Sequence, residues 1–373
     1  MIDRKPIART ARAVREILRR FGRIGRAEFA RQRSSVGARD LATILASLSA
    51  VHAEARNWVV HDSRAGEPEL MFIGPRGSLP AAIVRVARSS PGRSGLVRAR
   101  EALEALHVRL APSPSVAGVI PKILAYGELD GAAWLAEGAF SGRSGRELLS
   151  DPVRRRAVLE ETANAIDAIH AATARETVVG DTEIARWVTD RVRVVSELGT
   201  GTNVWRASSG ALAALTRIAA SVEAAIRGRT VTTSWIHGDL WPANVLLGGA
   251  AGAHLGIVDW DSAEPDELPL QDHLHLAISS RRIVDRKDLG TVVADLLGGV
   301  PWTLEDRIAL GGCAGASPHG PDLLTEGRGG LPSATALWLY WLRFVESNLA
   351  RHPELAADRT WVAGNIERVL LCA

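Results

Sequence analysis

One short stretch constrains the fold of this chain more than any other. Residues 234–261 begin with Ser-Trp-Ile-His-Gly-Asp-Leu-Trp-Pro-Ala-Asn-Val-Leu-Leu and end with Val-Asp-Trp-Asp. Three strand-like residues, 245–247, are followed by a glycine-rich connection and by a second apolar run at 254–258. This order predicts a β-hairpin, and the return of its second strand brings Asp259 back beside Asn244.

The polar residues around this hairpin are the types that phosphoryl transfer requires. Asp239 and Asn244 stand five positions apart. A kinase loop uses that interval to place an Asp that takes the acceptor hydroxyl's proton and an Asn that holds a metal ion. Oxygen ligands from Asn244 and Asp259, completed by water and phosphate, suit Mg²⁺. Any one of these residues is explained as well by a polar turn or a strand cap, but the ordered set favours transfer from a nucleotide.

The same residues carry a family resemblance. The segment from His237 to Leu247, followed by Ile-Val-Asp-Trp-Asp, resembles the catalytic loop and metal-binding Asp of the aminoglycoside phosphotransferase and choline kinase superfamily. The resemblance implies an α+β, bilobal protein-kinase-like fold with a small antiparallel-sheet N-lobe and a larger, mainly helical C-lobe. It also implies site roles: catalytic base Asp239, loop brace His237, Mg²⁺ ligands Asn244 and Asp259, and a supporting Asp261.

An N-lobe of this kind needs a cation that binds phosphate. Three short strands are predicted at 57–62, 69–73 and 81–87. The chain has only three lysines, and none falls in the third strand, where Arg85 stands instead. Arg keeps the charge and offers a planar fork of donors. We expect Arg85 to pair with Glu101 of the following helix, with Glu104 as a rival; the simpler interpretation of Arg85 is a strand residue that faces solvent.

Two further strands, at 122–127 and 132–136, lead into a segment that resembles the hinge of the family. The resemblance implies that the backbone of Glu137, Gly138, Ala139 and Phe140 contacts the nucleobase. A helix is predicted at 152–171, and His170 at its end is interpreted as structural. Further on, Glu267-Leu-Pro-Leu-Gln-Asp272 is similar to a helix start of the family. Asp272 is therefore expected to accept hydrogen bonds from the catalytic loop.

Charge and order together predict three parts: a basic N-terminal helical extension at 1–49, a nucleotide-binding N-lobe at 50–138, and a C-lobe with the catalytic loop and the acceptor site at 139–373. Residues 1–39 hold twelve Arg or Lys against three Asp or Glu, although the whole chain carries only +3. A helix of this kind could meet nucleic acid, an anionic membrane or a protein partner. We favour an accessory helix packed on the small lobe and do not expect nucleic acid as a partner.

Composition excludes several classes of protein. With 46% apolar residues the chain can bury a large core, and it has no uninterrupted apolar run of membrane-spanning length. Two isolated cysteines provide no disulfide framework. His237, His273 and His275 lack the spacing and the cysteine partners of a zinc motif. We expect a cytoplasmic enzyme that is a monomer or a homodimer.

The sequence therefore predicts a phosphotransferase that uses ATP, with GTP as the alternative, and Mg²⁺. Its expected acceptor is a hydroxyl of an amino sugar, an antibiotic or another natural product. A metabolic kinase of a sugar or a choline-like alcohol would use the same residues, and a non-catalytic pseudokinase or scaffold would explain the missing Lys. A protein kinase is least favoured, because Gly238 replaces the Arg of His-Arg-Asp and no activation-loop Ala-Pro-Glu segment follows.

Overall fold

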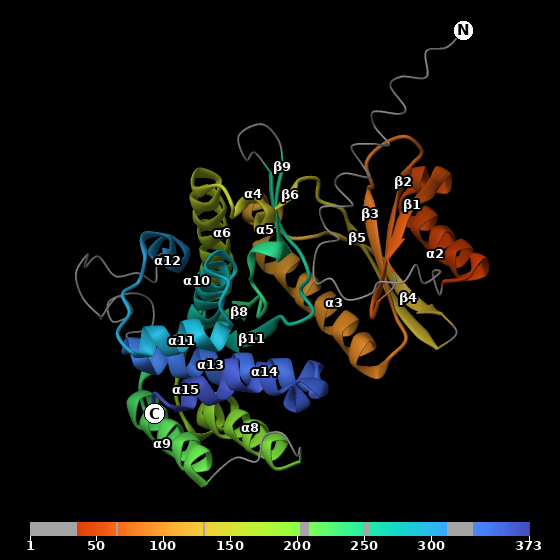
Figure 1. Ribbon diagram of the computed structural model, residues 1–373. Helices are drawn as coiled ribbons and strands as arrows, with labels where there is room; N and C mark the ends of the chain where they lie inside the picture. Colours follow the sequence, from red (N-terminus) through yellow and green to blue (C-terminus); the bar gives the residue numbers. More distant parts are fainter. Residues whose placement is uncertain (1–35, 65, 130, 202–208, 249–253, 312–330) are drawn as a thin grey trace. The chain divides into compact units, whose positions relative to one another are not determined.

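The computed structural model describes residues 36–64, 66–129, 131–201, 209–248, 254–311 and 331–373 (Figure 1). The chain divides into two compact units, which are described one at a time. The first comprises Met1–Leu148 and Ala243–Ala263, and the second comprises Leu149–Pro242 and Glu264–Ala373. Most of the predicted basic extension, residues 1–35, lies outside the described residues.

A five-stranded antiparallel sheet forms the centre of the first unit. Its strands run in the order β1-β2-β3-β5-β4. Their bounds are Trp58–Arg64 (β1), Glu69–Pro75 (β2), Ala82–Ala87 (β3), Ile123–Leu129 (β4) and Ala132–Gly138 (β5). Each strand overlaps the segment that the sequence predicted for it. The antiparallel N-lobe sheet is therefore confirmed.

The two faces of this sheet are covered by different helices (Figure 1). Helix α2 (Ala38–Val51), at the end of the predicted extension, packs Ile44 and Leu48 against one face, beside Val84 and Trp134. Successive strand residues point to opposite faces. Odd-numbered residues of β3 and β5 therefore face the other way, toward the long helix α3 (Ser90–Leu110). Helix α3 begins at a Ser cap, since the Ser89 side chain accepts from the Gly92 amide.

The predicted hairpin also belongs to the first unit. Strands β9 (Val245–Gly248) and β10 (His254–Ile257) pair antiparallel, with Val245 opposite Ile257. A short strand β6 (Arg143–Ser144) extends this second sheet in the order β10-β9-β6. The remaining short elements of the unit are the 3₁₀-helix η1 (Ala53–Asn57), α4 (Pro114–Ala117) and α5 (Gly145–Leu148).

Helices dominate the second unit. The longer ones are α6 (Pro152–Thr173), α8 (Asp190–Gly201), α9 (Ser209–Ile226), α10 (Leu270–Asp285), α11 (Leu289–Leu297), α12 (Leu304–Leu310) and α13 (Ser333–Arg351). The shorter ones are α7 (Asp181–Ile184), η2 (Ala185–Thr189), η3 (Pro242–Asn244), η6 (Pro353–Ala357), α14 (Arg359–Val362), η7 (Ala363–Glu367) and α15 (Arg368–Leu370). Of these, η3 runs across the boundary between the units. The third sheet has the order β11-β8-β7, formed by Glu264–Glu267 (β11), Thr230–Ile236 (β8) and Arg175–Val178 (β7). The predicted mainly helical C-lobe is therefore confirmed.

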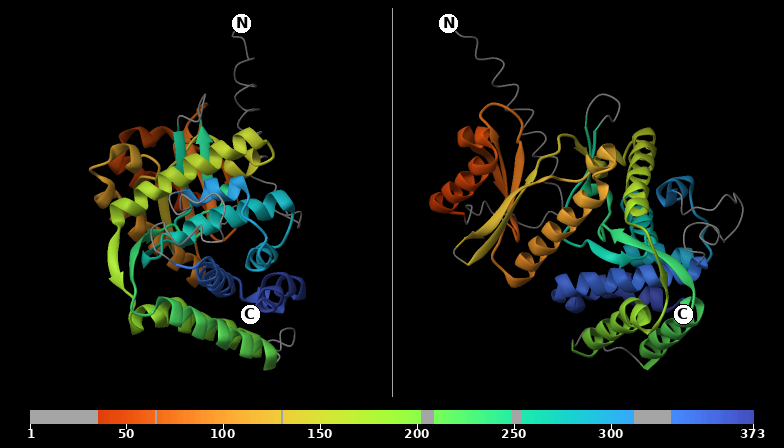
Figure 2. Two further views of the ribbon diagram at one scale, coloured as in Figure 1. Left: turned by 90° about the vertical axis from the view of Figure 1, so that its left-hand side faces the viewer. Right: turned by 180° about the vertical axis from the view of Figure 1, so that it is seen from behind.

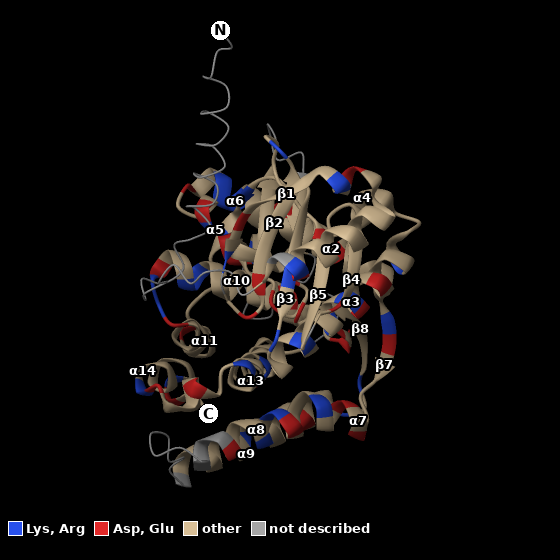
Figure 3. Ribbon diagram, turned by 90° about the vertical axis from the view of Figure 1, so that its right-hand side faces the viewer, with Lys and Arg blue, Asp and Glu red and all other residues tan. Residues whose placement is uncertain are grey.

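The core of the second unit gathers around α13. Trp338 and Trp341 of this helix are 8% and 0% exposed and pack edge to face. Helices α8 and α9 lie side by side (Figures 1 and 2). Helix α8 carries both acidic and basic residues (Figure 3), and Arg193 pairs with Asp190 and Glu197. None of the helices within the described residues combines the length and the apolar character needed to cross a bilayer.

Candidate active site

In the first unit, the side chain of Arg85 on β3 joins three carboxylates. It is 4% exposed. Its Nη2 donates to Glu137 Oε1 at 2.9 Å, and its Nη1 donates to Asp259 Oδ1 at 3.2 Å and to Asp261 Oδ1. Burial alone would lower the pKa of Arg85, but the charges of the three carboxylates raise it above its usual value. Arg85 is therefore a buried ion-pair centre, not a strand residue that faces solvent.

The sequence predicted that Arg85 pairs with Glu101, and this prediction is wrong. Glu101 on α3 is exposed, and its Oε1 lies 3.7 Å from Arg100 Nη2. Glu137 takes the place beside Arg85 because both residues lie on the face of the sheet turned away from α2, and Glu137 is two residues along β5 from Leu135, which pairs with Arg85. Burial raises the pKa of Glu137, in opposition to the lowering effect of Arg85.

Helix α3 holds Asp261 by a different contact. Arg98 Nε donates to the Asp261 backbone carbonyl at 3.0 Å. The helix also approaches Asp261 closely at Gly95, where an added Cβ would lie 3.3 Å from Asp261 Oδ2. The position of Asp261 is therefore fixed by its side chain on Arg85 and by its backbone on α3.

The hairpin carries the two predicted cation ligands at its open end. The Val258 amide donates to the Asn244 carbonyl at 2.9 Å, so Asn244 lies across from the residue before Asp259. Asp259 adopts a left-handed backbone with φ of 71°, which is uncommon for a residue other than glycine. Its side chain is 50% exposed. These oxygens form a donor set that fits a hard divalent cation, and in this structure the Arg85 guanidinium supplies the positive charge beside Asp259 and Asp261.

Two backbone amides of the hinge segment already donate hydrogen bonds within the first unit. The Gly138 amide donates to the Lys122 carbonyl at 2.8 Å, and the Ala139 amide donates to the Ala81 carbonyl at 2.9 Å. The ring of Phe140 lies against Gly256 so closely that a side chain at 256 would clash with it. Contact between this segment and a nucleobase stays a prediction, and it requires backbone groups other than these two amides.

In the second unit, Asp272 at the start of α10 holds the loop that follows β8. It is fully buried, and it accepts hydrogen bonds from the His237 amide at 2.7 Å and the Gly238 amide at 2.8 Å. His170 Nε2 lies 3.0 Å from Asp272 Oδ2. Burial alone would raise the pKa of Asp272, but the hydrogen bonds and charges of the two histidines lower it to about 2. The hydrogen bonds that the sequence predicted for Asp272 are confirmed.

The loop contains a residue in the left-handed backbone region, which favours glycine. Gly238 has φ of 78°, which explains why this position carries no larger side chain. Its carbonyl accepts from Arg343 Nη1 at 2.7 Å, and Arg343 Nη2 lies 3.3 Å from Glu264 Oε1. The side chain of His237 is fully buried, and its Nδ1 accepts from the Asp239 amide at 3.2 Å. The Gly238 carbonyl and the Asp239 amide are therefore each held by a buried side chain.

A histidine and an arginine flank the carboxylate of Asp239. His275 Nε2 lies 3.2 Å from Oδ1, and Arg351 Nη1 lies 3.7 Å from Oδ2. Burial alone would raise the pKa of Asp239, but the hydrogen bond from His275 and the charges of its neighbours hold that pKa well below its usual range. The side chain is still 29% exposed. The carboxylate is thus ionised and partly accessible to solvent.

His275 links this carboxylate to a buried hydroxyl. Its Nδ1 lies 2.9 Å from the Tyr340 hydroxyl oxygen. One neutral tautomer satisfies both contacts: Nε2–H donates to Asp239, and Nδ1 accepts from Tyr340. Burial raises the pKa of Tyr340 well above its usual value, and the charge of Asp239 adds to this, so the hydroxyl keeps its proton.

The acid sensitivity of Asp272 leads to a measurable prediction. Its folded-state pKa is depressed from 3.8 to about 2, so its stabilising effect is present above the unfolded value and is lost as pH falls through the folded one. The difference between the unfolded and folded pKa values corresponds to about 2 kcal/mol of unfolding free energy. Urea unfolding between pH 5 and pH 2 should show a shallower acid loss in Asp272→Asn than in the wild type. The exposed-site control Asp190→Asn should follow the wild type, and identical pH slopes in all three proteins would contradict this role.

The sequence missed several groups of the candidate site. His275 and Arg351 beside Asp239, Arg343 beneath Gly238 and the side chain of Glu137 beside Arg85 were not assigned there. One signal was available for His275, because it stands three positions after Asp272 and therefore on the same face of the helix. The predicted convergence of Asp239 with Asn244 and Asp259 joins residues of two units and stays a prediction.

The sheet-based first unit, the helical second unit and the loop bearing Asp239 define a protein-kinase-like phosphotransferase. The model of the phosphotransferase enzyme family matches residues 52–300, and the chain belongs to this family. No curated protein matches the sequence.

Several solved structures are similar to this chain. A thermostable mutant of the aminoglycoside phosphotransferase APH(4)-Ia, in a ternary complex with ADP and hygromycin B, is 16% identical with a TM-score of 0.50, covering 84% of this chain and 95% of its own. The GDP complex of aminoglycoside 2'-phosphotransferase-IIIa is 15% identical with a TM-score of 0.49, covering 89% and 97%. A microcompartment-associated aminopropanol kinase is 14% identical with a TM-score of 0.48, covering 90% and 100%.

Proposed function

We propose that this phosphotransferase moves the γ-phosphoryl group of ATP, or of GTP, to a hydroxyl group of an amino sugar, an antibiotic or another natural product. The observation that carries the proposal is the environment of Asp239, an ionised and partly exposed carboxylate held by His275 and Arg351. Five positions later stands Asn244, at the end of the hairpin that also carries Asp259. The solved structure of an APH(4)-Ia mutant is, by its description, a ternary complex with ADP and hygromycin B.

In the proposed mechanism Asp239 orients the acceptor alcohol. Its low pKa makes it a weak base in the ground state, so it accepts a hydrogen bond from the hydroxyl first and takes the proton late in the transfer. Asn244 and Asp259 provide oxygen ligands for Mg²⁺. When bound, the ion offsets negative charge on the phosphate oxygens.

Arg85 has two roles in this proposal. Its Nη2 stays with the buried Glu137, which anchors the guanidinium in the sheet. Its Nη1 neutralises Asp259 and Asp261 before nucleotide binds, and it is the group we assign to the nucleotide phosphates once Asp259 serves the cation. Arg85 thus fills the place of the usual strand Lys through a different carboxylate partner.

An acceptor screen tests the proposed function. The purified protein is incubated with Mg²⁺ and either ATP or GTP against a panel of aminoglycosides, other amino sugars, simple sugars and amino alcohols. Release of nucleoside diphosphate and the mass of a phosphorylated product are measured together. Phosphorylation of an amino sugar or a natural product supports the proposal. Exclusive phosphorylation of a simple sugar or a choline-like alcohol would replace it with a metabolic kinase, and the absence of turnover across the panel would contradict it.

The contact between His275 and Asp239 leads to a second prediction. His275→Leu removes a donor to a charged acceptor, which should lower kcat about tenfold. The pKa of Asp239 should then rise, so the acid limb of the pH–rate profile should move to higher pH. His275→Gln offers an amide donor and should recover part of both effects. If the limb does not move in His275→Leu, His275 does not act through Asp239.

A further inference from the structure

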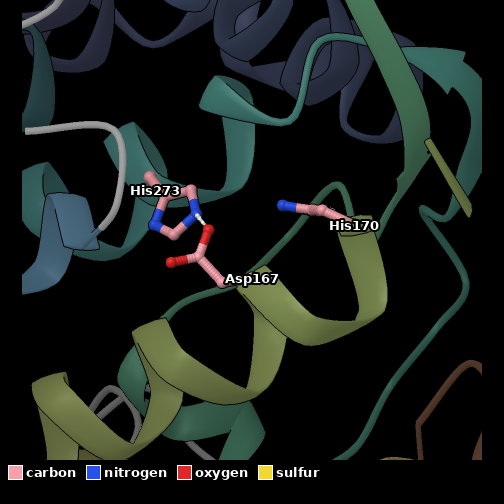
Figure 4. Close-up of side chains that lie close together, drawn as sticks. All are labelled: Asp167, His170 and His273. Atoms are coloured by element: carbon pink, nitrogen blue, oxygen red, sulfur yellow. Dashed lines mark hydrogen bonds and ion pairs between the residues drawn. The ribbon is translucent and has the colours of Figure 1, made fainter. Parts of the chain in front are cut away.

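Three side chains that the proposed mechanism does not use lie together inside the second unit. Asp167 and His170 stand on α6, and His273 stands on α10. Each offers one ligand atom, and these atoms lie within 4.8 Å of one another. Figure 4 shows a ring nitrogen of His170 pointing toward the pair formed by Asp167 and His273. The two histidine rings meet edge to face with centroids 5.6 Å apart.

The hydrogen bonding of His170 leaves one nitrogen with a lone pair. Its Nε2 faces the carboxylate of Asp272, which can only accept, so this nitrogen carries the hydrogen. The lone pair is then on Nδ1, which is buried and has no hydrogen-bond partner among the residues that the structure describes. A buried imidazole nitrogen with an unused lone pair is the form that binds a metal ion.

His273 presents the same arrangement. Its Nδ1 lies 3.1 Å from the carbonyl oxygen of Ala309 on α12, so Nδ1 carries the hydrogen. Its Nε2 lies 3.2 Å from Asp167 Oδ1 (Figure 4). In the neutral ring, the lone pair of His273 Nε2 and a lone pair of Asp167 Oδ1 point at each other. Either a proton or a metal cation must therefore lie between them.

We propose that Asp167, His170 and His273 bind a divalent transition metal of the Zn²⁺ type. Two imidazoles and one carboxylate are a donor set that Zn²⁺ accepts, with a fourth position for water. Ligands at about 2.0–2.1 Å around a tetrahedral ion are about 3.3 Å apart, which matches the separation of Asp167 and His273. The acceptors behind the two rings, Asp272 and the Ala309 carbonyl, are the outer partners that orient metal-binding histidines.

The position of this site gives it a structural effect on the catalytic loop. The ion would link α6 to α10. It would also fix the ring of His170, whose other nitrogen is hydrogen-bonded to Asp272. Asp272 in turn holds the amides of His237 and Gly238. Because the folded protein binds the ion through three buried or nearly buried groups, excess metal should raise the unfolding temperature. The site is separate from the Mg²⁺ ligands assigned to phosphoryl transfer.

The test uses Co²⁺ as a spectroscopic probe on the full chain, after treatment with a chelator and dialysis. The expected result is one equivalent of Co²⁺ per chain with the visible absorption of a four-coordinate site, displaced by Zn²⁺. His273→Gln and Asp167→Asn should each weaken binding at least tenfold. His352→Gln, at an exposed histidine beside Glu354, is the matched control and should bind as the wild type does. These readouts do not depend on turnover, so they can fail or succeed independently of the proposed function.

Two further comparisons keep the outcome decisive. If His273→Gln does not fold, the Asp167→Asn variant alone tests the site. The Asp167 side chain is 17% exposed and the substitution preserves its shape, so this variant should fold. His275→Gln should retain Co²⁺ binding, which excludes the pair formed by His275 and Asp239 as the source of the signal. The proposal is overturned if the stripped wild type binds no more Co²⁺ than Asp167→Asn. Asp167 and His273 then form a protonated ion pair only.

Discussion

Asp239→Asn should lower kcat by about 10² to 10⁴, the range that a positioned base contributes. The substitution keeps the size of the side chain but removes the charge and the strong acceptor that orient the alcohol. The change should leave the Kd for ATP close to that of the wild type, because Asp239 contacts neither cation nor nucleotide in the proposed mechanism. Steady-state turnover with the acceptor found in the screen and a separate nucleotide titration measure the two effects.

Controls separate this effect from loss of folding. Asp190→Asn alters an exposed carboxylate on α8 in the same unit and should leave kcat unchanged. Urea unfolding of both variants shows whether each is folded under the assay conditions. Near-normal turnover in a folded Asp239→Asn would remove this residue from the role of base.

Arg85→Met should cost about 3–5 kcal/mol of unfolding free energy, the usual cost when one partner of a buried ion pair is removed. The reason is Glu137, which is 6% exposed and would keep a buried charge without its closest cation. Arg85→Lys should fall in between, because an ammonium group keeps the charge but cannot reach several carboxylates with a planar fork. Urea titration gives the free energy of unfolding for each variant.

A double variant makes this prediction sharper. Arg85→Met combined with Glu137→Gln removes both charges and should recover part of the stability that the single change loses. Arg76→Met, at an exposed arginine in the turn after β2, is the matched control and should change stability by less than about 0.5 kcal/mol. Equal losses in the single and double variants would show that the buried charge of Glu137 is not the cause.

The parts of the fold that depend on local pattern were predicted from the sequence. The five strands of the small sheet, the hairpin and helix α6 follow from short-range periodicity and from turn residues, and the structure places them close to the predicted bounds. The start of α10 was predicted from the family resemblance. Asp272 was found because its motif is contiguous with the start of its helix.

Contacts between residues far apart in the chain were predicted poorly. Arg85 was identified on its strand, yet its partner Glu137 lies 52 positions away and was assigned only a backbone role. A charged residue at the end of the apolar strand Ala132–Gly138 was a usable signal. Arg351, which flanks Asp239, lies on a helix of the C-terminal region and carries no local mark of this contact. His170 and His273 are 103 positions apart in number, so no sequence spacing revealed their proximity.

The central claim is that the carboxylate of Asp259 holds the cation that accompanies the nucleotide phosphates, in a phosphotransferase whose base is Asp239. Titration with Mn²⁺, followed by electron paramagnetic resonance in the presence of a non-hydrolysable ATP analogue, tests this most directly. The wild type and Asp239→Asn should both bind nucleotide-dependent Mn²⁺, whereas Asp259→Asn should bind it at least tenfold more weakly. Equal Mn²⁺ binding by the wild type and Asp259→Asn would contradict the assignment.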